Sequence, residues 1–256
     1  MIHTTVILAM SADGKITDCA LTAARFGSAN DKSHLEQQVA NSDAVLFGNG
    51  TLRAYGTTMR VTSPDLIAQR KLQGKPPQPV QIVCSRSREF DPNWRFFQQP
   101  IPRWLLTGND CRDTALPSPL SSSLLFSPLG GGRGGLTFDS GATSQFDRTL
   151  TANTIDGEID WIDAFQQLET LGIKRLAILG GGKLVASVLA AGLIDELWLT
   201  VCPLILGGAD APTPVEGKGF LAGLAPKLEL LAVKQVGGEV FLHYRVDRAQ
   251  SQNTHK

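Results

Sequence analysis

The sequence predicts an α/β protein built on one mostly parallel central sheet, with helices on both faces and an antiparallel C-terminal hairpin. Three observations favour this fold class. Short apolar runs alternate with amphipathic stretches along most of the 256 residues, as in proteins whose parallel strands are connected by helices. The apolar runs end in polar or glycine-rich turns, which is typical of buried strands. Near the C-terminus, two long runs flank Gly237-Gly238, a two-residue turn suited to positive φ.

Composition narrows the range of partners. Hydrophobic residues make up 42% of the chain, charged residues make up 19%, and the formal net charge is zero. Lys and Arg are scattered among an equal number of acids, so we expect no basic face for nucleic acid. No apolar stretch approaches the ~20 residues that span a bilayer, and the N-terminus leads straight into a strand pattern, without a signal peptide. We expect a soluble, cytoplasmic protein without a nucleic-acid or membrane partner.

The cysteines and the other reactive residues suggest neither a metal site nor a covalent nucleophile. The four cysteines form no C-x-x-C pair and have no histidine at metal-ligand spacing. No Ser-His-Asp order or nucleophile elbow is present in the sequence. We expect reduced thiols in a reducing compartment and no metal.

The first half of the chain predicts strands that alternate with helices. The β-branched and apolar run Thr4–Met10 predicts a buried strand, which ends in the turn Ser11–Gly14. Asn30 or Asp31 can cap a helix that runs to Asn41. Further apolar runs predict strands over Ala44–Phe47, Val80–Cys84 and Trp104–Thr107. A run that begins with proline predicts a surface helix over Pro64–Gln73.

The stretch Pro117–Gln145 is rich in Ser, Gly and Pro, a composition typical of flexible connections. It could link two domains or be an insertion between strands of one sheet. We prefer the insertion, because the residues before it have no obvious way to complete a sheet alone. The sequence therefore predicts a single domain over residues 1–248 with a flexible segment near 117–145, followed by a disordered polar tail over 249–256.

Regular structure is expected to return at Asp156. Apolar residues recur at spacings of three from Ile162 to Leu171, which predicts an amphipathic helix that Asp160 can cap and Gly172 can end. The remaining runs predict a strand, a helix, a strand and the terminal hairpin: Leu176–Leu179, Gly180 to about Ala191, Glu196–Val201, and Leu228–Val236 with Val240–Val246.

The strongest local motif is Gly180-Gly181-Gly182-Lys183, which follows a predicted strand and opens a helix. Glycines let a backbone approach a ligand closely, and a helix start offers unpaired N–H groups and the positive end of a dipole. A phosphate fits such a site, and Lys183 adds positive charge. The motif is not a complete dinucleotide fingerprint, because Val185 stands at its last glycine position. A tight turn without a ligand is an equally good interpretation.

Three weaker motifs also follow predicted strands. Gly48–Thr51 can form a ligand-binding loop, and Ser85–Arg88 offers hydroxyl and guanidinium groups to a phosphate monoester. Asp13 can be a catalytic or substrate-binding acid. Each also has a plain structural interpretation, respectively a turn, a solvated basic loop and a turn cap. Their combination is more informative, because loops that follow parallel strands of one sheet gather along one edge.

Five ordered blocks of the sequence resemble the riboflavin-biosynthesis reductase family, the reductase half of the bifunctional deaminase-reductase. The first block matches the family's Ser-x-Asp-Gly-Lys-Ile motif, and the second matches its Asp-Ala-Val-Leu-x-Gly-x-Gly-Thr motif. The blocks are Ala9–Ile16, Asp43–Leu52, Gly180–Leu184, Gly192–Leu197 and Pro203–Gly208. Five ordered blocks over nearly the whole chain are more specific than any single motif. The zinc signature of the deaminase half is absent from the sequence.

The resemblance implies a dihydrofolate-reductase-like fold, a homodimer, and NADPH as hydride donor. It also implies a ribosylamino pyrimidine 5′-phosphate substrate, whose opened ribose is reduced to a ribityl chain in riboflavin biosynthesis. Asp13 is then expected near the nicotinamide and the substrate, as a catalytic and substrate-binding acid, and Ser85 and Arg86 are expected to face the adenosine 2′-phosphate. The expected cofactor-binding residues are Gly48, Asn49, Thr51, Ser85, Arg86, Gly180, Gly181, Gly182 and Lys183.

Two departures from the family pattern leave the substrate open. The Asp-Asp-Pro segment that usually follows the second block is replaced here, and Arg53 and Arg60 are the expected substrate-binding cations. Leu179 stands where the family often has Glu before the triple glycine. We therefore expect a riboflavin-pathway reductase and keep two alternatives. One is a reductase of the same fold for a pterin or another small imine or carbonyl compound, and the other is a noncatalytic nucleotide-binding protein.

Overall fold

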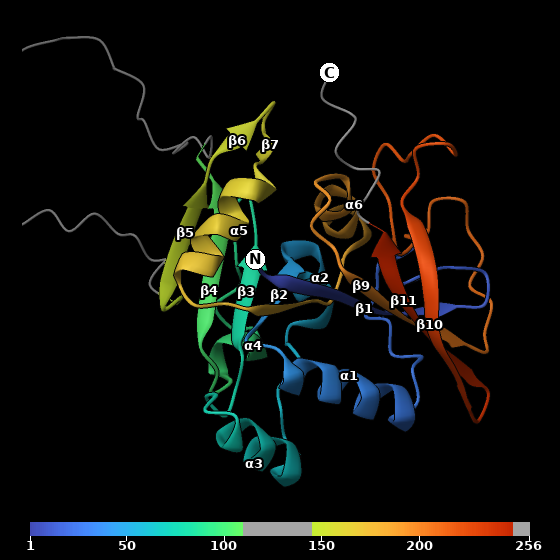
Figure 1. Ribbon diagram of the computed structural model, residues 1–256, viewed down its shortest axis with the longest axis horizontal. Coiled ribbons are helices and arrows are strands. Elements are labelled where there is room, and N and C mark those ends of the chain that lie inside the picture. The colour runs from blue at the N-terminus through green and yellow to red at the C-terminus, as the bar shows by residue number, and fades with distance from the viewer. Residues whose placement is uncertain (110–144, 248–256) are drawn as a thin grey trace, which may run out of the picture.

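The computed structural model describes residues 1–109 and 145–247, which form a long mixed sheet flanked by helices (Figure 1). The predicted Ser/Gly-rich segment lies outside the described residues except for Gln145, and the predicted tail lies outside them as well. Strands from both sides of the gap pair in one sheet. This pairing is consistent with a single domain over residues 1–248, and that division stays a prediction.

Nine described strands form the central sheet: β1 (His3–Ser11), β2 (Ala44–Gly48), β3 (Val80–Cys84), β4 (Arg103–Gly108), β5 (Arg148–Ala152), β8 (Arg175–Ile178), β9 (Glu196–Cys202), β10 (Lys227–Val236) and β11 (Glu239–Asp247). Their order in the sheet is β10-β11-β9-β1-β8-β2-β3-β4-β5. Neighbours from β9 to β5 pair in parallel, whereas β11 runs antiparallel to both β9 and β10. The predicted parallel sheet with an antiparallel terminal hairpin is confirmed.

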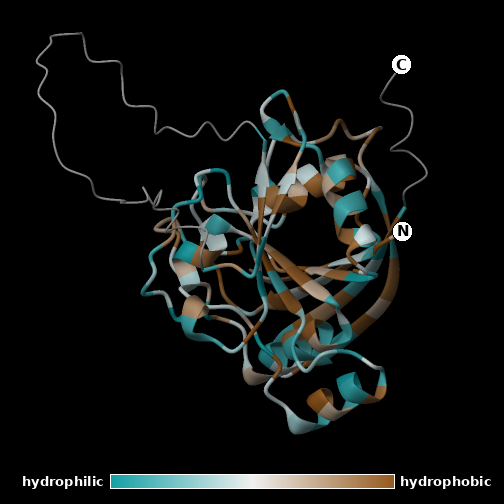
Figure 2. Ribbon diagram, turned by 90° about the vertical axis from the view of Figure 1, so that its left-hand side faces the viewer, coloured by the Kyte–Doolittle hydropathy of each residue, from teal (hydrophilic) through white to brown (hydrophobic). Residues whose placement is uncertain are grey.

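Helices cover both faces of this sheet. They are α1 (Ala29–Asn41), α2 (Asn49–Tyr55), α3 (Pro64–Leu72), α4 (Arg95–Gln98), α5 (Trp161–Thr170) and α6 (Gly182–Ala190). Figure 1 shows α1 and α6 on opposite sides of β1, and Figure 2 shows hydrophobic residues gathered along the strands between the helices. Side chains of α5 and α6 contribute to one apolar cluster, and side chains of α1, α2 and α4 to another. Within β1, Val6 and Leu8 belong to the first cluster and Ile7 to the second, as the two-residue period of a strand requires.

The start of α1 differs from the sequence prediction. Ser28, rather than Asn30 or Asp31, caps the helix, and its hydroxyl oxygen accepts hydrogen bonds from the N–H groups of both residues. The difference matters for the site, because it leaves the Asp31 carboxyl group available for other contacts.

Two other segments also differ from their predictions. Gly48–Thr51 is not a loop: Gly48 is the N-cap of α2, which continues to Tyr55. Regular structure returns at Arg148 in β5, before Asp156, and a small hairpin of β6 (Thr154–Ile155) and β7 (Glu158–Ile159) precedes α5. The sequence pattern missed β5 because it is an edge strand whose residues are largely polar and exposed.

Candidate functional site

The four sequence motifs lie along one edge of the sheet. Because β1, β8, β2 and β3 are neighbouring parallel strands, the residues that follow them meet at their carboxyl-terminal edge. Asp13 follows β1, Gly180 follows β8, Gly48 ends β2, and Ser85 follows β3. The Gly48 N–H donates to the Gly180 carbonyl oxygen at 3.2 Å. The topology therefore places the motifs side by side, as the sequence led us to expect.

The fold itself requires two glycines of the triple-glycine loop. Gly180 is buried and has a φ of 114°, a conformation that residues with side chains rarely adopt. Gly182 begins α6, and a Cβ atom there would collide with the Thr213 carbonyl oxygen and lie 2.8 Å from Oε2 of Glu216. The protein chain, rather than a ligand, therefore occupies the space beside Gly182.

The space beside Gly181 and beside the start of α2 is open and suits a phosphate. A Cβ atom on Gly181 would meet only Thr51 Oγ1 within 4 Å, at 3.7 Å, and one on Gly48 or Gly50 would meet nothing within 4 Å. No side chain caps the start of α6, and Lys183 in its first turn is exposed. A helix N-terminus, a hydroxyl group, close backbone and a cation fit the pyrophosphate of a nucleotide.

Asn49, the first residue of α2, carries an unsatisfied polar atom near this space. Its Nδ2 donates to the Glu89 carbonyl oxygen at 3.4 Å, whereas its Oδ1 is buried and accepts no hydrogen bond from the described residues. A buried acceptor without a donor costs about 1–3 kcal/mol. The hydroxyl and amino donors of a bound nucleotide would satisfy it, so Asn49 also fits a cofactor site.

The residues expected to face the 2′-phosphate already have partners in the protein. Ser85 is buried, and its Oγ accepts from the Arg88 N–H at 3.3 Å, which closes the turn after β3. Arg86 is exposed and pairs with Glu158 of β7, with 3.1 Å between Arg86 Nη1 and Glu158 Oε1. A phosphate at this place would share Arg86 with Glu158. The exposed guanidinium group is accessible to such a ligand, and the Ser85 hydroxyl group is the less accessible of the two.

Asp13 is a fixed hydrogen-bond acceptor. Its carboxylate accepts from the Ser11 hydroxyl at 2.6 Å, the Leu206 N–H at 3.1 Å and the Gly207 N–H at 2.7 Å. The Ser11 bond and then the two backbone bonds lower the pKa of Asp13 to about 2. The group is therefore ionised at neutral pH and is unsuited to donate a proton. It ties the turn after β1 to the segment after β9.

The two arginines expected to bind the substrate lie apart. Arg53 is exposed on α2, whose first residues form the Gly48–Thr51 motif. Arg60 precedes Val61, whose N–H donates to the Gln78 side chain at 2.9 Å and whose carbonyl oxygen accepts from it at 2.7 Å, just before β3 begins. Arg60 is therefore placed near the amino-terminal edge of the sheet. The structure brings Arg53 to the motif edge and does not bring Arg60 there.

Sequence reasoning missed a carboxyl group near the same edge. Asp31 in the first turn of α1 is half-buried, and it accepts a hydrogen bond from the hydroxyl of Thr200 in β9. Burial raises the pKa of Asp31, the nearby Glu239 carboxylate raises it further, and the Thr200 hydrogen bond opposes the rise. The charge of Asp31 also acts on Tyr55 of α2. The pattern gave no signal for this role, because an acid in the first turn of a helix is common.

Glu239 fixes the helix that carries Asp31. It is 3% exposed, and its carboxylate accepts from the Ser28 N–H at 2.7 Å and from the Ser28 hydroxyl at 2.5 Å. Ser28 is the N-cap of α1, so the start of this helix is anchored to β11. The position of Asp31 is therefore set by contacts from two strands that lie far from it in the sequence.

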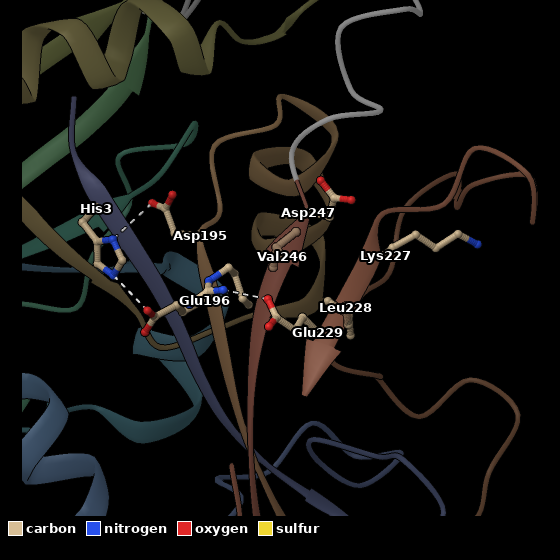
Figure 3. Close-up of a pocket in the computed structure, with 9 residues that line it drawn as sticks. His3, Asp195, Glu196, Lys227, Leu228, Glu229, Val246 and Asp247 are labelled. Carbon is tan, nitrogen blue, oxygen red and sulfur yellow. Dashed lines mark hydrogen bonds and ion pairs between the residues drawn. The ribbon is translucent and has the colours of Figure 1, made fainter. Parts of the chain in front are cut away.

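A surface pocket lies at the opposite edge of the sheet (Figure 3). His3 stands between Asp195 and Glu196, with nitrogen–oxygen distances of 3.8 and 3.6 Å, and Arg245 pairs with Glu229 at 2.7 Å. These residues lie at the beginnings of β1 and β10, at or just before the beginning of β9, and near the end of β11. Charges of both signs are already paired with one another there, and none of the four motifs lines this pocket, so the candidate site is not here.

The described residues give little support for a metal site, a reactive thiol or a membrane-spanning helix. Within residues 1–109 and 145–247, no group of three or more His, Cys, Asp or Glu side chains is arranged to hold a metal ion. Burial raises the pKa of the Cys84 thiol to about 12, which disfavours the reactive thiolate. No helix in the described parts of the chain is long and apolar enough to cross a membrane.

The parallel sheet, its terminal hairpin and the loops at one edge define the α/β class of protein that the sequence predicts. A solved pyrimidine reductase-like protein from Corynebacterium diphtheriae matches the structure with a TM-score of 0.70 at 20% identity, over 96% of this chain and 92% of that one. The chain belongs to the RibD C-terminal domain family, which matches residues 3–242. The family expected from the five sequence blocks is therefore confirmed.

Two archaeal relatives are similar over most of their length. Both are called 2,5-diamino-6-ribosylamino-4(3H)-pyrimidinone 5′-phosphate reductase. The protein from Archaeoglobus fulgidus is 26% identical over 219 residues, which cover 84% of this chain and 87% of the relative. The protein from Methanothermobacter thermautotrophicus is 25% identical over 240 residues, which cover 93% of this chain and 95% of the relative.

Proposed function

We propose that this protein is an NADPH-dependent reductase of riboflavin biosynthesis, which converts a ribosylamino pyrimidine 5′-phosphate to its ribitylamino form. The family match over residues 3–242 carries this proposal. The shared edge of the four motifs supports it, and the two relatives' names favour the 2,5-diamino pyrimidinone as substrate. The same proposal includes a cytoplasmic location, as expected from the sequence.

In this proposal, the cofactor binds the segments that follow β8, β2 and β3. NADPH would supply the hydride. Gly181, Thr51 and the start of α6 would bind its pyrophosphate, with Gly180 and Gly182 keeping the loop in shape and Lys183 adding charge. The other proposed contacts come from the α2 and β3 ends: Gly48, Asn49, Ser85 and Arg86. Hydride transfer depends mainly on holding the two reacting carbons together, so positioning is the main task of these residues.

In this proposal, the substrate binds beside β1, α1 and α2. Asp13 would accept hydrogen bonds there and hold the β1 turn in place, and Arg53 is the better placed of the two arginines for the phosphate. Reduction of an imine also requires a proton at nitrogen. Asp31 is the carboxyl group that we assign to this proton, because it is half-buried in the first turn of α1 near this edge and its pKa is raised.

The proposal includes a homodimer, as the resemblance implies. The edge strand β10 offers a surface for it, because three large apolar side chains are about half exposed: Leu228 at 47%, Leu230 at 52% and Val233 at 57%. Exposed apolar residues on an unpaired edge strand favour association.

A second candidate is a reductase of the same fold that acts on a pterin or another small imine or carbonyl compound. Leu179 favours it, since this residue packs against apolar neighbours just before the glycine loop and offers no polar contact. The position of Arg60 away from the motif edge favours it as well. Rescue of a riboflavin auxotroph by this protein would count against this candidate.

The first test is a titration with NADPH and with NADH, in which nicotinamide fluorescence reports binding. We expect clear preference for NADPH, then NADPH oxidation with the diamino pyrimidinone phosphate or its deaminated form. Binding without turnover of any pyrimidine or pterin would instead favour a noncatalytic nucleotide-binding protein. Binding of neither nucleotide would overturn the reductase proposal.

A further inference from the structure

Glu216 places a carboxylate beside the triple-glycine loop. A Cβ atom on Gly182 would lie 2.8 Å from Glu216 Oε2 and 2.7 Å from its Cγ, so the side chain rests on the first residue of α6. Glu216 is half-buried. Within residues 1–109 and 145–247, its carboxylate oxygens form no hydrogen bond or ion pair. A half-buried carboxylate held at a ligand-binding loop without a partner is a candidate contact for the ligand.

The segment 211–217 holds Glu216 between two of the motif loops. On one side, Lys15 Nζ donates to the Ala211 carbonyl oxygen at 3.1 Å, which ties the segment to the turn after β1. On the other side, the Glu216 N–H donates to the Gly182 carbonyl oxygen at 3.1 Å. The fold therefore fixes where this carboxylate lies, on the β1 side of the loop and away from β3.

The charge of Glu216 divides the glycine loop into two parts. A phosphate beside Gly182 would face a carboxylate, and two anions in contact repel each other. The pyrophosphate is therefore favoured at Gly181 and Thr51, on the side of the loop away from this carboxylate. A carboxylate next to a pyrophosphate site suits hydroxyl donors, and acidic residues bind ribose hydroxyls in other nucleotide-binding folds.

We propose that Glu216 binds the hydroxyl groups of the ribose on the nicotinamide side of the cofactor. This inference rests on the proposed function. The nicotinamide-side ribose is assigned because Arg86, after β3, is the proposed contact of the adenosine half, whereas Glu216 is tied to the β1 turn that carries Asp13. Glu216 would thus position the reactive end of the cofactor and take no part in the chemistry.

Two ligands that differ by one sugar test the inference by calorimetry. 2′-Phospho-ADP-ribose carries the pyrophosphate and the second ribose, whereas 2′-phosphoadenosine 5′-diphosphate lacks that ribose. We expect Glu216→Ala to weaken the first ligand roughly ten- to hundred-fold, as expected for lost hydrogen bonds to a charged group. The second ligand should bind equally well or more tightly, because a negative charge beside the pyrophosphate is removed.

Two further variants make the test specific. Glu216→Gln keeps the shape and one acceptor, so its affinity for 2′-phospho-ADP-ribose should fall between those of the wild type and the alanine variant. Asp210→Asn removes an exposed carboxylate of the same connection and should leave both affinities unchanged. Circular dichroism of each variant checks folding.

The outcomes separate the two proposals. If the wild type binds both ligands and Glu216→Ala weakens neither, or weakens both equally, the ribose contact is wrong and the proposed function stands. If the wild type binds neither ligand, the proposed cofactor and this inference are both wrong.

Discussion

Two aspartates near the same edge of the sheet show how position decides chemistry. Asp13 is exposed and accepts hydrogen bonds from Ser11 and from two backbone N–H groups, and its pKa is lowered to about 2. Asp31 is half-buried near the Glu239 carboxylate, and its pKa is raised. The pKa of one carboxyl group is thus lowered by hydrogen bonds, and that of the other is raised by burial and a neighbouring charge.

In this protein, the sequence motif and the proposed acid role belong to different aspartates. The motif around Asp13 identifies the family, and its carboxylate has a geometric task that links the β1 turn to Leu206 and Gly207. Asp31 has no motif of its own, and its properties come from burial and a neighbouring charge. A reaction that needs a proton is better served by Asp31.

The largest effect is expected for Asp31→Asn. We expect turnover to fall about a hundred-fold or more, since this is the usual contribution of a general acid. In the wild type, kcat/KM should fall as the pH rises through the raised pKa of Asp31, because the protonated form is lost. This descending limb of the pH profile should disappear in the variant, while the affinity for NADPH stays unchanged. The pH dependence of steady-state NADPH oxidation measures both effects.

Asp65→Asn is the matched control, since Asp65 is also an acid in the first turn of a helix, on the exposed side of α3. Its pH profile should equal that of the wild type. Retention of the wild-type limb in Asp31→Asn would remove Asp31 from proton transfer.

A smaller effect is expected for Asp13→Asn. An amide has one acceptor oxygen where the carboxylate uses two, so the contact with Leu206 or with Gly207 is weakened. We expect kcat/KM to fall about ten-fold, as for one lost hydrogen bond, with no change in the shape of the pH profile between pH 5 and 9. Asp13 is already ionised over that range because its pKa is about 2. Loss of a titrating limb in this variant would instead make Asp13 the proton source.

The order of the elements and the shared edge of the motifs were predictable, because they depend on local patterns. Each apolar run that formed a strand carried its own turn residues, as with Thr4–Met10 and Ser11–Gly14. The roles of the two aspartates were not predictable. The backbone partners of Asp13, Leu206 and Gly207, lie 193 and 194 residues away in the sequence, and the groups that act on Asp31 are in β9 and β11. Burial and long-range hydrogen bonds leave no trace in local periodicity.

The substrate-binding arginines were harder to predict, because their positions also depend on how the chain folds. Arg53 and Arg60 were grouped because they are close in sequence, but the chain turns at Gly56, whose φ is 62°, and continues toward the other edge of the sheet. The glycine motif was easier, yet two of its three glycines serve the fold: Gly180 for its backbone conformation and Gly182 for its contact with the segment 211–217.

Two substitutions around Asp31 should move its pKa in opposite directions. Thr200→Val removes a hydrogen bond that lowers the pKa, so the limb of the pH profile should move to higher pH. Glu239→Gln removes a negative charge that raises it, so the limb should move to lower pH. The measurement is the pH dependence of kcat/KM. Thr149→Val on the exposed edge strand β5 is the control, and shifts of the same sign in both variants would contradict the assignment of the limb to Asp31.

The smallest effect on turnover is expected for Ser11→Ala. The Ser11 hydroxyl is the largest cause of the low pKa of Asp13, so its removal should raise that pKa toward the ordinary value of 3.8. Asp13 remains ionised at neutral pH, and turnover should stay within about two-fold of the wild type, as for a change that leaves the charge in place.

The same variant should show a distinct dependence of stability on pH. A carboxyl group with a lowered pKa stabilises the folded state above its unfolded pKa, and this contribution is lost as the pH falls through the folded pKa. The difference in urea midpoint between wild type and Ser11→Ala should therefore be full at neutral pH and shrink as the pH falls from 3.8 to about 2. A difference that is constant over this range would mean that the Ser11 hydroxyl acts on the turn without acting on the Asp13 charge.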